Sequence, residues 1–470
     1  MTLNLYHVFS YSGGIYVINV EEMRAYEIDE ETGIALERIS SKPTDAGRYV
    51  TPEIKSQLER LKLFPPRKVK QFKTHNPKTN VPPFRNVALF VTQNCNLNCS
   101  YCYGAGGSYG SPGHMARETA LRAVDWLIGQ SGEVKRLGVS FFGGEPLLNL
   151  RLIKEVIAYA CTKGEEFSKS FEFSITTNAS LLDRRTIAFL RDNNVKPVVS
   201  FDGCKQIQDE QRPFVGGRGS YEIIVPKIKE LLRVFPDATA RATLVGRTDP
   251  ATVIAALHEI GFTSTHITFA SASLFDALGD EAAENYESRS IAHMMEEEVA
   301  EIIDDIKNRY SSKLKERKSN SILVTRLGEF LNGQRRYFGC GAGRDYVGIS
   351  NAGDIFLCHR FVGMSSYKLG NVHAPHLEKK SYLDSPIKNN HKCAACFAKY
   401  ICGGGCYHEN LGGRGSLFGG SQQHCALMRR SVELISFLST QLSEDDKTYL
   451  VKAGIIARTP CPFDFPVRPS

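Results

Sequence analysis

The chain has 470 residues, of which 42% are hydrophobic and 23% charged, an ordinary composition for a globular protein of two or three domains. The net charge of +7 is small for this length, so it suits an acidic or phosphorylated ligand without being a nucleic-acid signature. The first residues lack a signal-peptide pattern, and no apolar run reaches the roughly 18 residues of a membrane span. We therefore expect a cytoplasmic protein without nucleic-acid or membrane partners.

The first part of the chain, residues 1–63, predicts a small α+β or winged-helix-like module. The stretches GGIYVINVEE and MRAYEIDEE alternate apolar and polar residues around a turn, which predicts a hairpin at 14–28. A helix is predicted in TPEIKSQLERLKLF, with Thr51 as its cap and Pro52 in its first turn. Residues 64–85 are proline-rich and basic, as linkers often are.

Residues 86–330 alternate strand patterns, such as VALFVTQN, RLGVSFFGG, FEFSITT, KPVVSFDG and ATARATLVG, with helical patterns. This alternation predicts a parallel α/β sheet with right-handed crossovers. Polar and glycine motifs follow the strands, where α/β barrels carry their sites. One long helix is predicted over 293–316. Residues 335–470 are rich in glycine and cysteine until a C-terminal helix, and such a region needs metals to fold.

The cysteines are the unusual feature, because there are 13 of them. Disulfides are disfavoured in the cytosol, so metal binding or catalysis is the better interpretation. Three cysteines lie at 95–102 and seven at 340–425, whereas Cys161 lies in the helical pattern LIKEVIAYAC and is interpreted as a packed residue.

The motif CNLNCSYC offers the thiols of Cys95, Cys99 and Cys102 just after a strand. Three thiolates can bind three irons of a [4Fe–4S] cluster and leave the fourth iron open. With Tyr101 before the last cysteine, the motif resembles that of radical S-adenosylmethionine (SAM) enzymes. The resemblance implies a partial (β/α)6 TIM-like barrel over 86–330. It also implies that SAM binds the open iron and is cleaved to a 5′-deoxyadenosyl radical. A chance metal or redox site is the alternative for the motif alone.

Further motifs lie where the resembled family contacts SAM, each after one of the next strands. GGEP would place its backbone at the SAM amino group, and a carboxylate partner would come from an arginine with bidentate geometry. The SAM contacts implied in this way are Tyr101, Gly143, Gly144, Glu145, Pro146, Thr177, Asn178, Ser200, Asp202 and Arg241. Taken singly, each has a plain structural alternative, such as a glycine turn, a helix cap or a surface ion pair.

The second group of cysteines resembles the SPASM domain, an auxiliary-cluster module of radical SAM enzymes that modify peptides. By this resemblance, one [4Fe–4S] cluster has the ligands Cys393, Cys396, Cys402 and Cys425, and another has Cys340, Cys358 and Cys406. That makes three [4Fe–4S] clusters in all, although zinc also suits paired CxxC motifs. Gln334 stands where fully ligated relatives have an eighth cysteine, so the second auxiliary cluster either has an open iron or takes an internal ligand such as His359 or Cys461.

An open auxiliary iron would hold a substrate thiolate beside the carbon radical. We therefore predict a radical SAM maturase that forms thioether cross-links in a ribosomally made, cysteine-containing peptide or small protein. The resemblance is to ranthipeptide and SCIFF maturases or the quinohemoprotein amine dehydrogenase maturase. Asp202, His359 and Cys204 are the candidate catalytic residues, and a flavodoxin- or ferredoxin-type protein would donate electrons. The N-terminal module would dock a leader peptide by β-augmentation, or serve as a structural cap.

Two alternatives remain open. One is another radical peptide modification, namely formylglycine formation, epimerisation or carbon–carbon cross-linking. The other is a zinc-stabilised peptide-binding protein.

Overall fold

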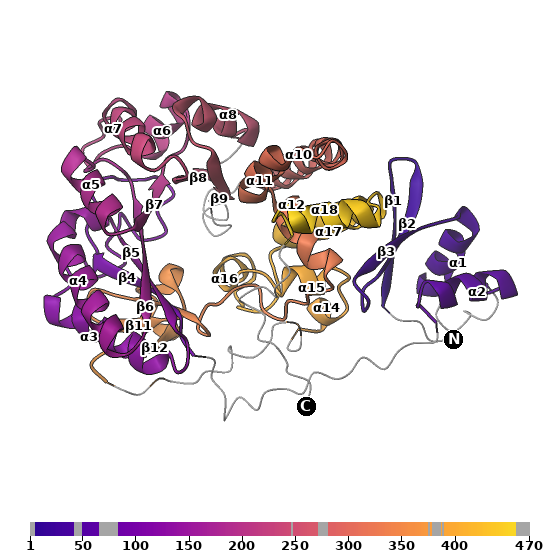
Figure 1. The fold of residues 1–470 in the computed structure, drawn as a ribbon, viewed down its shortest axis with the longest axis horizontal. Helices are drawn as coiled ribbons and strands as arrows, with labels where there is room; N and C mark the ends of the chain where they lie inside the picture. The colour runs from indigo at the N-terminus through magenta and orange to yellow at the C-terminus, as the bar shows by residue number, and fades with distance from the viewer. Residues whose placement is uncertain are drawn as a thin grey trace. The chain divides into compact units, whose positions relative to one another are not determined.

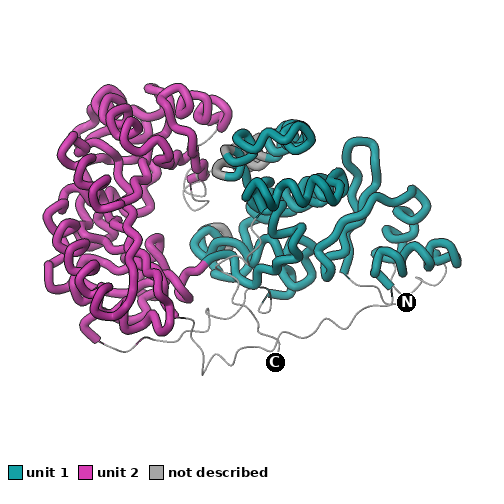
Figure 2. Tube along the Cα trace, in the orientation of Figure 1, with its two compact units in different colours: residues 1–75, 288–340, 384–470 teal, residues 76–287, 341–383 magenta. Residues whose placement is uncertain are grey.

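The computed structural model describes residues 5–41, 49–64, 83–245, 248–270, 281–374, 377, 387 and 390–456. It divides into two compact units, which Figure 2 shows in different colours. Unit 1 contains residues 1–75, 288–340 and 384–470, and unit 2 contains residues 76–287 and 341–383. Most of the predicted linker 64–85, and Cys461, lie outside the described residues. The predicted segment 335–470 is divided between the units, because part of it joins the sheet of unit 2.

Unit 2 is built on a nine-stranded sheet with the order β12-β11-β10-β4-β5-β6-β7-β8-β9. Its strands are β4 (Asn86–Thr92), β5 (Arg136–Gly143), β6 (Ser170–Thr177), β7 (Val195–Ser200), β8 (Thr239–Leu244), β9 (Ser264–Phe269), β10 (Tyr346–Ile349), β11 (Asp354–Phe356) and β12 (Lys368–Asn371). Strands β4 to β9 pair in parallel in chain order, which confirms the predicted α/β fold with a partial (β/α)6 barrel. Strand β10 adds a further parallel strand beside β4, and it comes from the cysteine-rich segment.

Helices cover one face of this sheet, which we call its outer face (Figure 1). They are α3 (Arg117–Gln130), α4 (Leu150–Glu166), α5 (Arg184–Asp192), α6 (Lys205–Gln211), α7 (Tyr221–Val234) and α8 (Pro250–Ile260). Unit 2 also contains the short 3-10 turns η2 (Pro146–Asn149), η3 (His359–Phe361) and η4 (Ser365–Tyr367). Along β8, Ala240, Ala242 and Leu244 are fully buried, whereas the residues between them are only partly buried. Because strand residues alternate between faces, Thr239, Arg241 and Thr243 belong to the opposite, inner face.

Unit 1 begins with a three-stranded antiparallel sheet, β1 (Tyr6–Tyr11), β2 (Gly14–Asn19) and β3 (Arg24–Ile28). Strands β2 and β3 form the predicted hairpin, and α2 (Pro52–Arg60) is the predicted helix, capped by Thr51. Strand β1 and helix α1 (Glu30–Ser41) were not predicted.

The remaining helices of unit 1 are α10 (Glu281–Lys307), whose first residues belong to unit 2, α11 (Ser311–Asn320), α12 (Ile322–Leu331), α14 (His391–Ala394), α15 (Lys399–Cys402), α16 (Tyr407–Arg414), α17 (Gln422–Thr440) and α18 (Glu444–Lys452). The single helix predicted over 293–316 is wrong, because α10 ends before α11 begins. Arg309 between them has φ of 61°, a left-handed conformation that a continuing helix does not allow. Its guanidinium instead donates to Asp446 at 2.7 Å.

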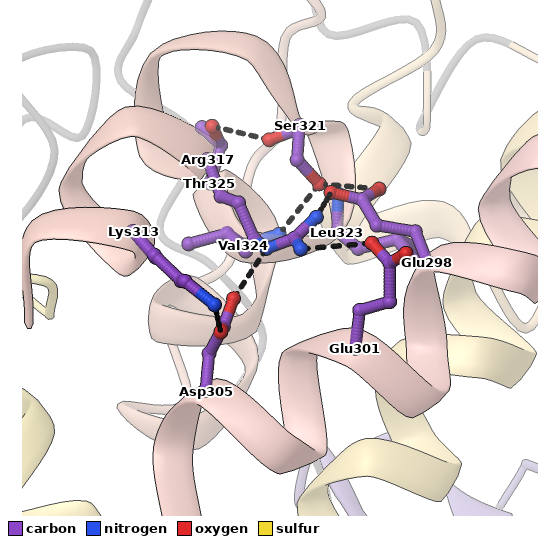
Figure 3. Close-up of polar contacts among 9 residues, drawn as sticks. All are labelled: Glu298, Glu301, Asp305, Lys313, Arg317, Ser321, Leu323, Val324 and Thr325. Atoms are coloured by element: carbon purple, nitrogen blue, oxygen red, sulfur yellow. Dashed lines mark hydrogen bonds and ion pairs between the residues drawn. The ribbon is translucent and has the colours of Figure 1, made fainter. Parts of the chain in front are cut away.

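Helices α10, α11 and α12 are held together by one arginine (Figure 3). Arg317 Nε donates to Asp305 at 2.6 Å, and Arg317 Nη2 donates to Glu301 at 2.8 Å. Ser321 Oγ caps α12 by accepting from two backbone N–H groups, and it donates to Glu298 at 2.9 Å. None of the described helices is both long and apolar enough to cross a membrane.

Candidate active site at the three-cysteine loop

The loop CNLNCSYC follows β4 at the carboxyl edge of the sheet, and backbone hydrogen bonds hold it in place. The N–H groups of Asn98 and Ser100 donate to the carbonyls of Pro213 and Gln211 at 2.8 and 2.9 Å. Val215 N in turn donates to Asn96 O at 3.0 Å. The segment that follows α6 therefore fixes the shape of the cysteine loop.

The three thiols of the loop lie close enough for their charges to interact. Burial raises the pKa of Cys95 to about 12, and thiolates at Cys99 and Cys102 add to this effect. Two N–H groups point to Cys95 Sγ, from Leu97 at 3.5 Å and from the Asn178 side chain at 3.9 Å. Hydrogen bonds to sulfur help to stabilise the thiolate ligands of an iron–sulfur cluster. A nearby cation does the same, and here it is Arg212, whose Nη1 lies 4.0 Å from Cys99 Sγ. The donor set therefore fits a cluster with three thiolate ligands.

The motif GGEP brings the ends of β4 and β5 into close contact. Gly143 has φ of 135°, and a Cβ on it or on Gly144 would collide with the backbone carbonyls of Thr92 and Asn94. Gly144 N donates to Thr92 O at 3.1 Å, and Glu145 N donates to Asn94 O at 2.9 Å. Only glycine permits this approach, so the motif places backbone beside the cysteine loop.

Glu145 is a fully buried carboxylate that ties three segments together. Its oxygens accept from Thr177 Oγ1 at 2.8 Å, from Asn178 N at 2.7 Å and from Leu147 N at 3.1 Å. Burial raises the pKa of Glu145 to about 7, although these hydrogen bonds act in the opposite direction. The role of Glu145 visible in the structure is to fix the turns after β5 and β6.

The turn after β6 is joined to the cysteine loop by amide groups. Asn178 Nδ2 donates to Asn96 Oδ1 at 3.0 Å, and Asn96 Nδ2 donates to Ser180 Oγ at 2.8 Å. Thr177 and Asn178, predicted as SAM contacts, therefore lie against the loop of Cys95.

Asp202, at the end of β7, is the centre of a buried polar network. Tyr101 Oη donates to its Oδ2 at 2.6 Å, Arg212 Nε donates to the same oxygen at 2.9 Å, and Thr243 N donates to Oδ1 at 2.9 Å. Burial by itself would lower the pKa of Arg212, but the nearby carboxylate of Asp202 raises it. Arg212 therefore remains a cation. Tyr101 and Asp202, both predicted from sequence, are therefore brought together.

Arg212 is the site residue that sequence reasoning missed. Its Nη1 lies 4.0 Å from Cys99 Sγ, and its guanidinium lies 5.1 Å from the centre of the Tyr101 ring. The available signal was an arginine nine residues after SFDG, at the end of the helix that follows this motif. A carboxylate buried at the end of a strand, as Asp202 is, needs a compensating cation, and Arg212 supplies it.

Ser200 and Arg241 are neighbours on adjacent strands of the inner face. The charge of Arg241 acts on Tyr103, Tyr346 and His266, so its side chain reaches the same space as theirs. Its predicted contact with SAM remains a prediction.

Cys358 and His359 lie at the end of β11, next to β10. Tyr346 Oη lies 2.8 Å from His359 Nδ1, and the His359 ring lies 5.0 Å from the Phe142 ring, just before GGEP. Cys358 is buried, and its charge acts on Tyr346 and Tyr103. By contrast, Cys204 precedes α6 and has Tyr221 of α7 as a neighbour. Catalytic roles for Asp202, His359 and Cys204 remain predictions.

Four cysteines of the second group lie together in unit 1. Burial raises the pKa of Cys402 to about 12, and charges at Cys425, Cys396 and Cys393 add to it. His424 Nε2 lies 3.8 Å from Cys402 Sγ. The four thiols are near enough for their charges to interact, and their role as the ligands of one auxiliary cluster remains a prediction.

The other predicted set includes residues of both units. Cys340 and Cys406 belong to unit 1 and follow Gly339 and Gly405, where a Cβ on Gly339 would lie 2.9 Å from Gly405 N. Cys358 belongs to unit 2. Within the described residues, no three or more His, Cys, Asp or Glu side chains are placed to hold one metal ion. The ligand roles of these cysteines remain predictions.

Residues 89–260 match the family described as Radical SAM superfamily. This part of the chain is a radical SAM domain, which implies a [4Fe–4S] cluster and SAM. The matched range begins within β4 and ends with α8, so it includes the cysteine loop, GGEP, Thr177 and Asp202.

Two curated proteins are similar to parts of this chain. An uncharacterized protein of Methanocaldococcus jannaschii is 33% identical over 141 residues, which cover 30% of this chain and 46% of that protein. The radical SAM cyclopropyl synthase TigE of Paramaledivibacter caminithermalis is 31% identical over 129 residues, covering 25% of this chain and 26% of TigE. The chain thus spans less than half of the length of these relatives.

Solved structures of anSMEcpe with bound AdoMet have the same fold. One has a TM-score of 0.61 at 18% identity and covers 75% of this chain and 96% of its own. A second, with bound AdoMet and a Cp18Cys peptide, has a TM-score of 0.60 at 17% identity. At these identities the similarity concerns the fold.

Proposed function

We propose that this enzyme forms thioether bonds between a cysteine sulfur and a carbon of a ribosomally made peptide or small protein. Cys358 and the three-cysteine loop have Tyr103 as a common neighbour, and this observation carries the proposal. Tyr103 follows Cys102 directly in the chain. The guanidinium of Arg360, two residues after Cys358, lies 5.4 Å from the centre of the Tyr103 ring. A sulfur site at Cys358 would therefore lie near the SAM site.

The residues of the cysteine loop would hold the first cluster, and those around it would position SAM. When bound, the cluster and SAM supply reductive cleavage to a 5′-deoxyadenosyl radical. Arg241 would bind the carboxylate of SAM, as predicted from the sequence. Arg212 places a buried cation beside Cys99, and the backbone of Gly143 and Gly144 faces the same loop. Tyr101 and Asp202 keep Arg212 in position, since both contact it. The protein thus orients its reactants and excludes water.

The peptide substrate is proposed from the relatives as well as the site. TigE is a cyclopropyl synthase, and anSMEcpe has been solved with a bound peptide. The cysteines Cys393, Cys396, Cys402 and Cys425 would hold one auxiliary cluster and Cys340, Cys358 and Cys406 another. Electrons would come from a reduced flavodoxin- or ferredoxin-type protein.

Anaerobic iron and sulfide analysis tests the cluster count. Three clusters require about twelve irons per chain, about four of which should be lost when the Cys393 set is replaced by alanine. Bound zinc with little iron would instead support the zinc-stabilised peptide-binding alternative.

The reaction is tested with cysteine-containing candidate peptides. The reconstituted enzyme with SAM and a reductant should remove two hydrogens per cross-link, and the product cysteine should resist alkylation. Cys358→Ala should abolish this product, whereas Cys161→Ala should not. Cys161 lies on α4 and is exposed, so its interpretation as a packed residue was wrong. A product of unchanged mass would indicate epimerisation, and an alkylatable cysteine after loss of two hydrogens would indicate a carbon–carbon bond. Formylglycine formation would consume the cysteine without any cross-link.

A further inference from the structure

Arg212 joins a buried carboxylate to one thiol of the cysteine loop. Its Nε donates to Asp202 Oδ2 at 2.9 Å, and its Nη1 lies 4.0 Å from Cys99 Sγ. Tyr101 Oη donates to the same carboxylate at 2.6 Å, and the centre of the Tyr101 ring lies 5.1 Å from the guanidinium. These contacts hold the charge of Arg212 in a fixed position beside Cys99.

Both charges of this ion pair are shielded from water. The side chain of Asp202 is fully buried, and that of Arg212 is only 8% exposed. Buried charges are screened much less by salt and water than charges at a surface, so they act strongly on groups near them. Arginine also keeps its proton in proteins. The cysteine loop therefore has a permanent cation beside it.

The donors to Cys95 are neutral, in contrast to the guanidinium at Cys99. Cys95 Sγ accepts from the backbone of Leu97 at 3.5 Å and from the Asn178 side chain at 3.9 Å. Hydrogen bonds from a charged donor are roughly twice as strong as those between neutral groups. Arg212 is therefore the donor expected to have the largest electrostatic effect on this loop.

The charge of Arg212 bears on electron uptake at the loop. A [4Fe–4S] cluster becomes more negative by one charge when it takes up one electron. A fixed cation nearby stabilises the more negative state, whereas the anion of Asp202 opposes this effect. Net charge and hydrogen bonds to sulfur are among the factors that set the reduction potential of such clusters.

We propose that Arg212 raises the reduction potential of the cluster held by the cysteine loop, and that Asp202 moderates this rise. The inference rests on the cluster of the proposed function, but not on the peptide substrate or the thioether bond. Asp202 then has two effects, because it fixes the guanidinium in position and offsets part of its charge. The ion pair sets how strong a reductant the enzyme requires.

A redox titration of the reconstituted enzyme with dithionite, followed by electron paramagnetic resonance, tests this proposal. The variant with alanine at Cys95, Cys99 and Cys102 lacks the loop cluster, so its spectrum identifies the signals of any other clusters. Arg212→Gln should make the loop cluster about tenfold harder to reduce, which is a potential about 59 mV lower. Asp202→Asn should raise the potential, because its amide still accepts from Arg212 but no longer offsets the cation. Arg212→Lys keeps the charge and should restore most of the wild-type potential.

Opposite shifts distinguish an electrostatic role from a structural one, since a loosened loop would affect both single variants alike. Arg218→Gln is the matched control, because Arg218 belongs to the same segment after α6 but is exposed, so that solvent screens its charge. It should leave the potential unchanged. The double variant Asp202→Asn/Arg212→Gln removes both charges at nearly constant size, and its potential should lie between those of the single variants. It keeps the sign of the effect measurable should one single variant fail to fold.

Equal potentials of the wild type and Arg212→Gln, each with a complete loop cluster, would overturn this inference and leave the proposed function intact. Shifts of the same sign in Arg212→Gln and Asp202→Asn would also overturn it. The expected shifts in an enzyme that forms no cross-link would refute the thioether chemistry alone. A spectrum identical to that of the variant without the three cysteines would refute both proposals.

Discussion

Asp202 shows how a single residue can be charged and fully buried. Its carboxylate accepts from a phenol, a guanidinium and a backbone N–H, so its lone pairs are satisfied without water. When the Gln211 amide is oriented with its nitrogen toward Asp202, this nitrogen donates a further hydrogen bond to Asp202 Oδ2 at 3.1 Å. Such a network is rigid, and it fixes Tyr101 and Arg212 beside the cysteine loop.

Glu145 gives a pH dependence to the stability of the iron-free protein. Its pKa is about 7 in the folded state, because it is buried, and near 4.5 when it is unfolded. Its contribution to stability is complete below about pH 4.5 and is lost as pH rises through about 7, because the unfolded chain releases the proton more readily. The free energy of unfolding should fall by about 3 kcal/mol over this pH range.

Thermal unfolding of the wild type and Glu145→Gln between pH 5 and 8 measures this contribution. The wild type should lose stability relative to the neutral variant as pH rises. Parallel pH profiles for the two proteins would show that the buried carboxylate is already ionised at pH 5.

At the scale of elements, Arg317 of α11 joins α10 to the start of α12 (Figure 3). The side chain of Asp305 is only 3% exposed, and Arg317 is its hydrogen-bonded cation, while Lys313 lies further away at 3.7 Å. Glu298 also contacts Arg317 and accepts from Ser321, the cap of α12. The guanidinium therefore compensates carboxylates that would repel one another.

Arg317→Ala should lower the free energy of unfolding by about 2 kcal/mol, because it leaves the buried Asp305 without its hydrogen-bonded cation. Chemical denaturation of the iron-free protein measures this loss. The control is Arg151→Ala, which breaks an ion pair with Glu155 whose arginine is 92% exposed, and which should have little effect. Similar losses in both variants would contradict the assigned role of Arg317.

At the scale of the whole molecule, the N-terminal sheet is part of the core of unit 1. One of its faces packs on α1 and α2 through Val17, and the other packs on α12 and α17 through Phe9, Tyr16 and Ile18. Glu21 fastens this arrangement, since Lys399 and Tyr400 both donate to its carboxylate at 2.8 Å. The module is therefore held in unit 1 on both faces.

Glu21→Gln should lower the free energy of unfolding by about 3 kcal/mol, since Lys399 is only 10% exposed and would lose its anion. It should also make the chain more sensitive to proteases at the N-terminal module. Glu22→Gln is the control, because the ion pair of Glu22 with Lys62 is long, at 3.9 Å, and more exposed. An unchanged stability of Glu21→Gln would show that apolar packing alone holds the module.

The sequence by itself determined the α/β class and the cysteine loop. Period-2 patterns such as FEFSITT report burial that a strand imposes locally, and CxxxCxxC keeps its thiols close through short loop geometry. Tyr101 and Asp202 were also predicted, because they stand in motifs at strand ends. Helix α1 was missed, because Gly33 interrupts its pattern. That glycine leaves room for Ile15, whose Cγ2 would lie only 3.2 Å from a Cβ at this position.

Only the tertiary structure decided which distant residues meet. Arg212 contacts Asp202 because the turn after α6 folds back onto the cysteine loop, and no local pattern encodes that return. Arg241 and His266 become neighbours through the register of β8 and β9, which long-range packing sets. Strand β10 joins the sheet beside β4 with only four residues, too few for a periodic signal, and thereby places Tyr346 next to Asn86.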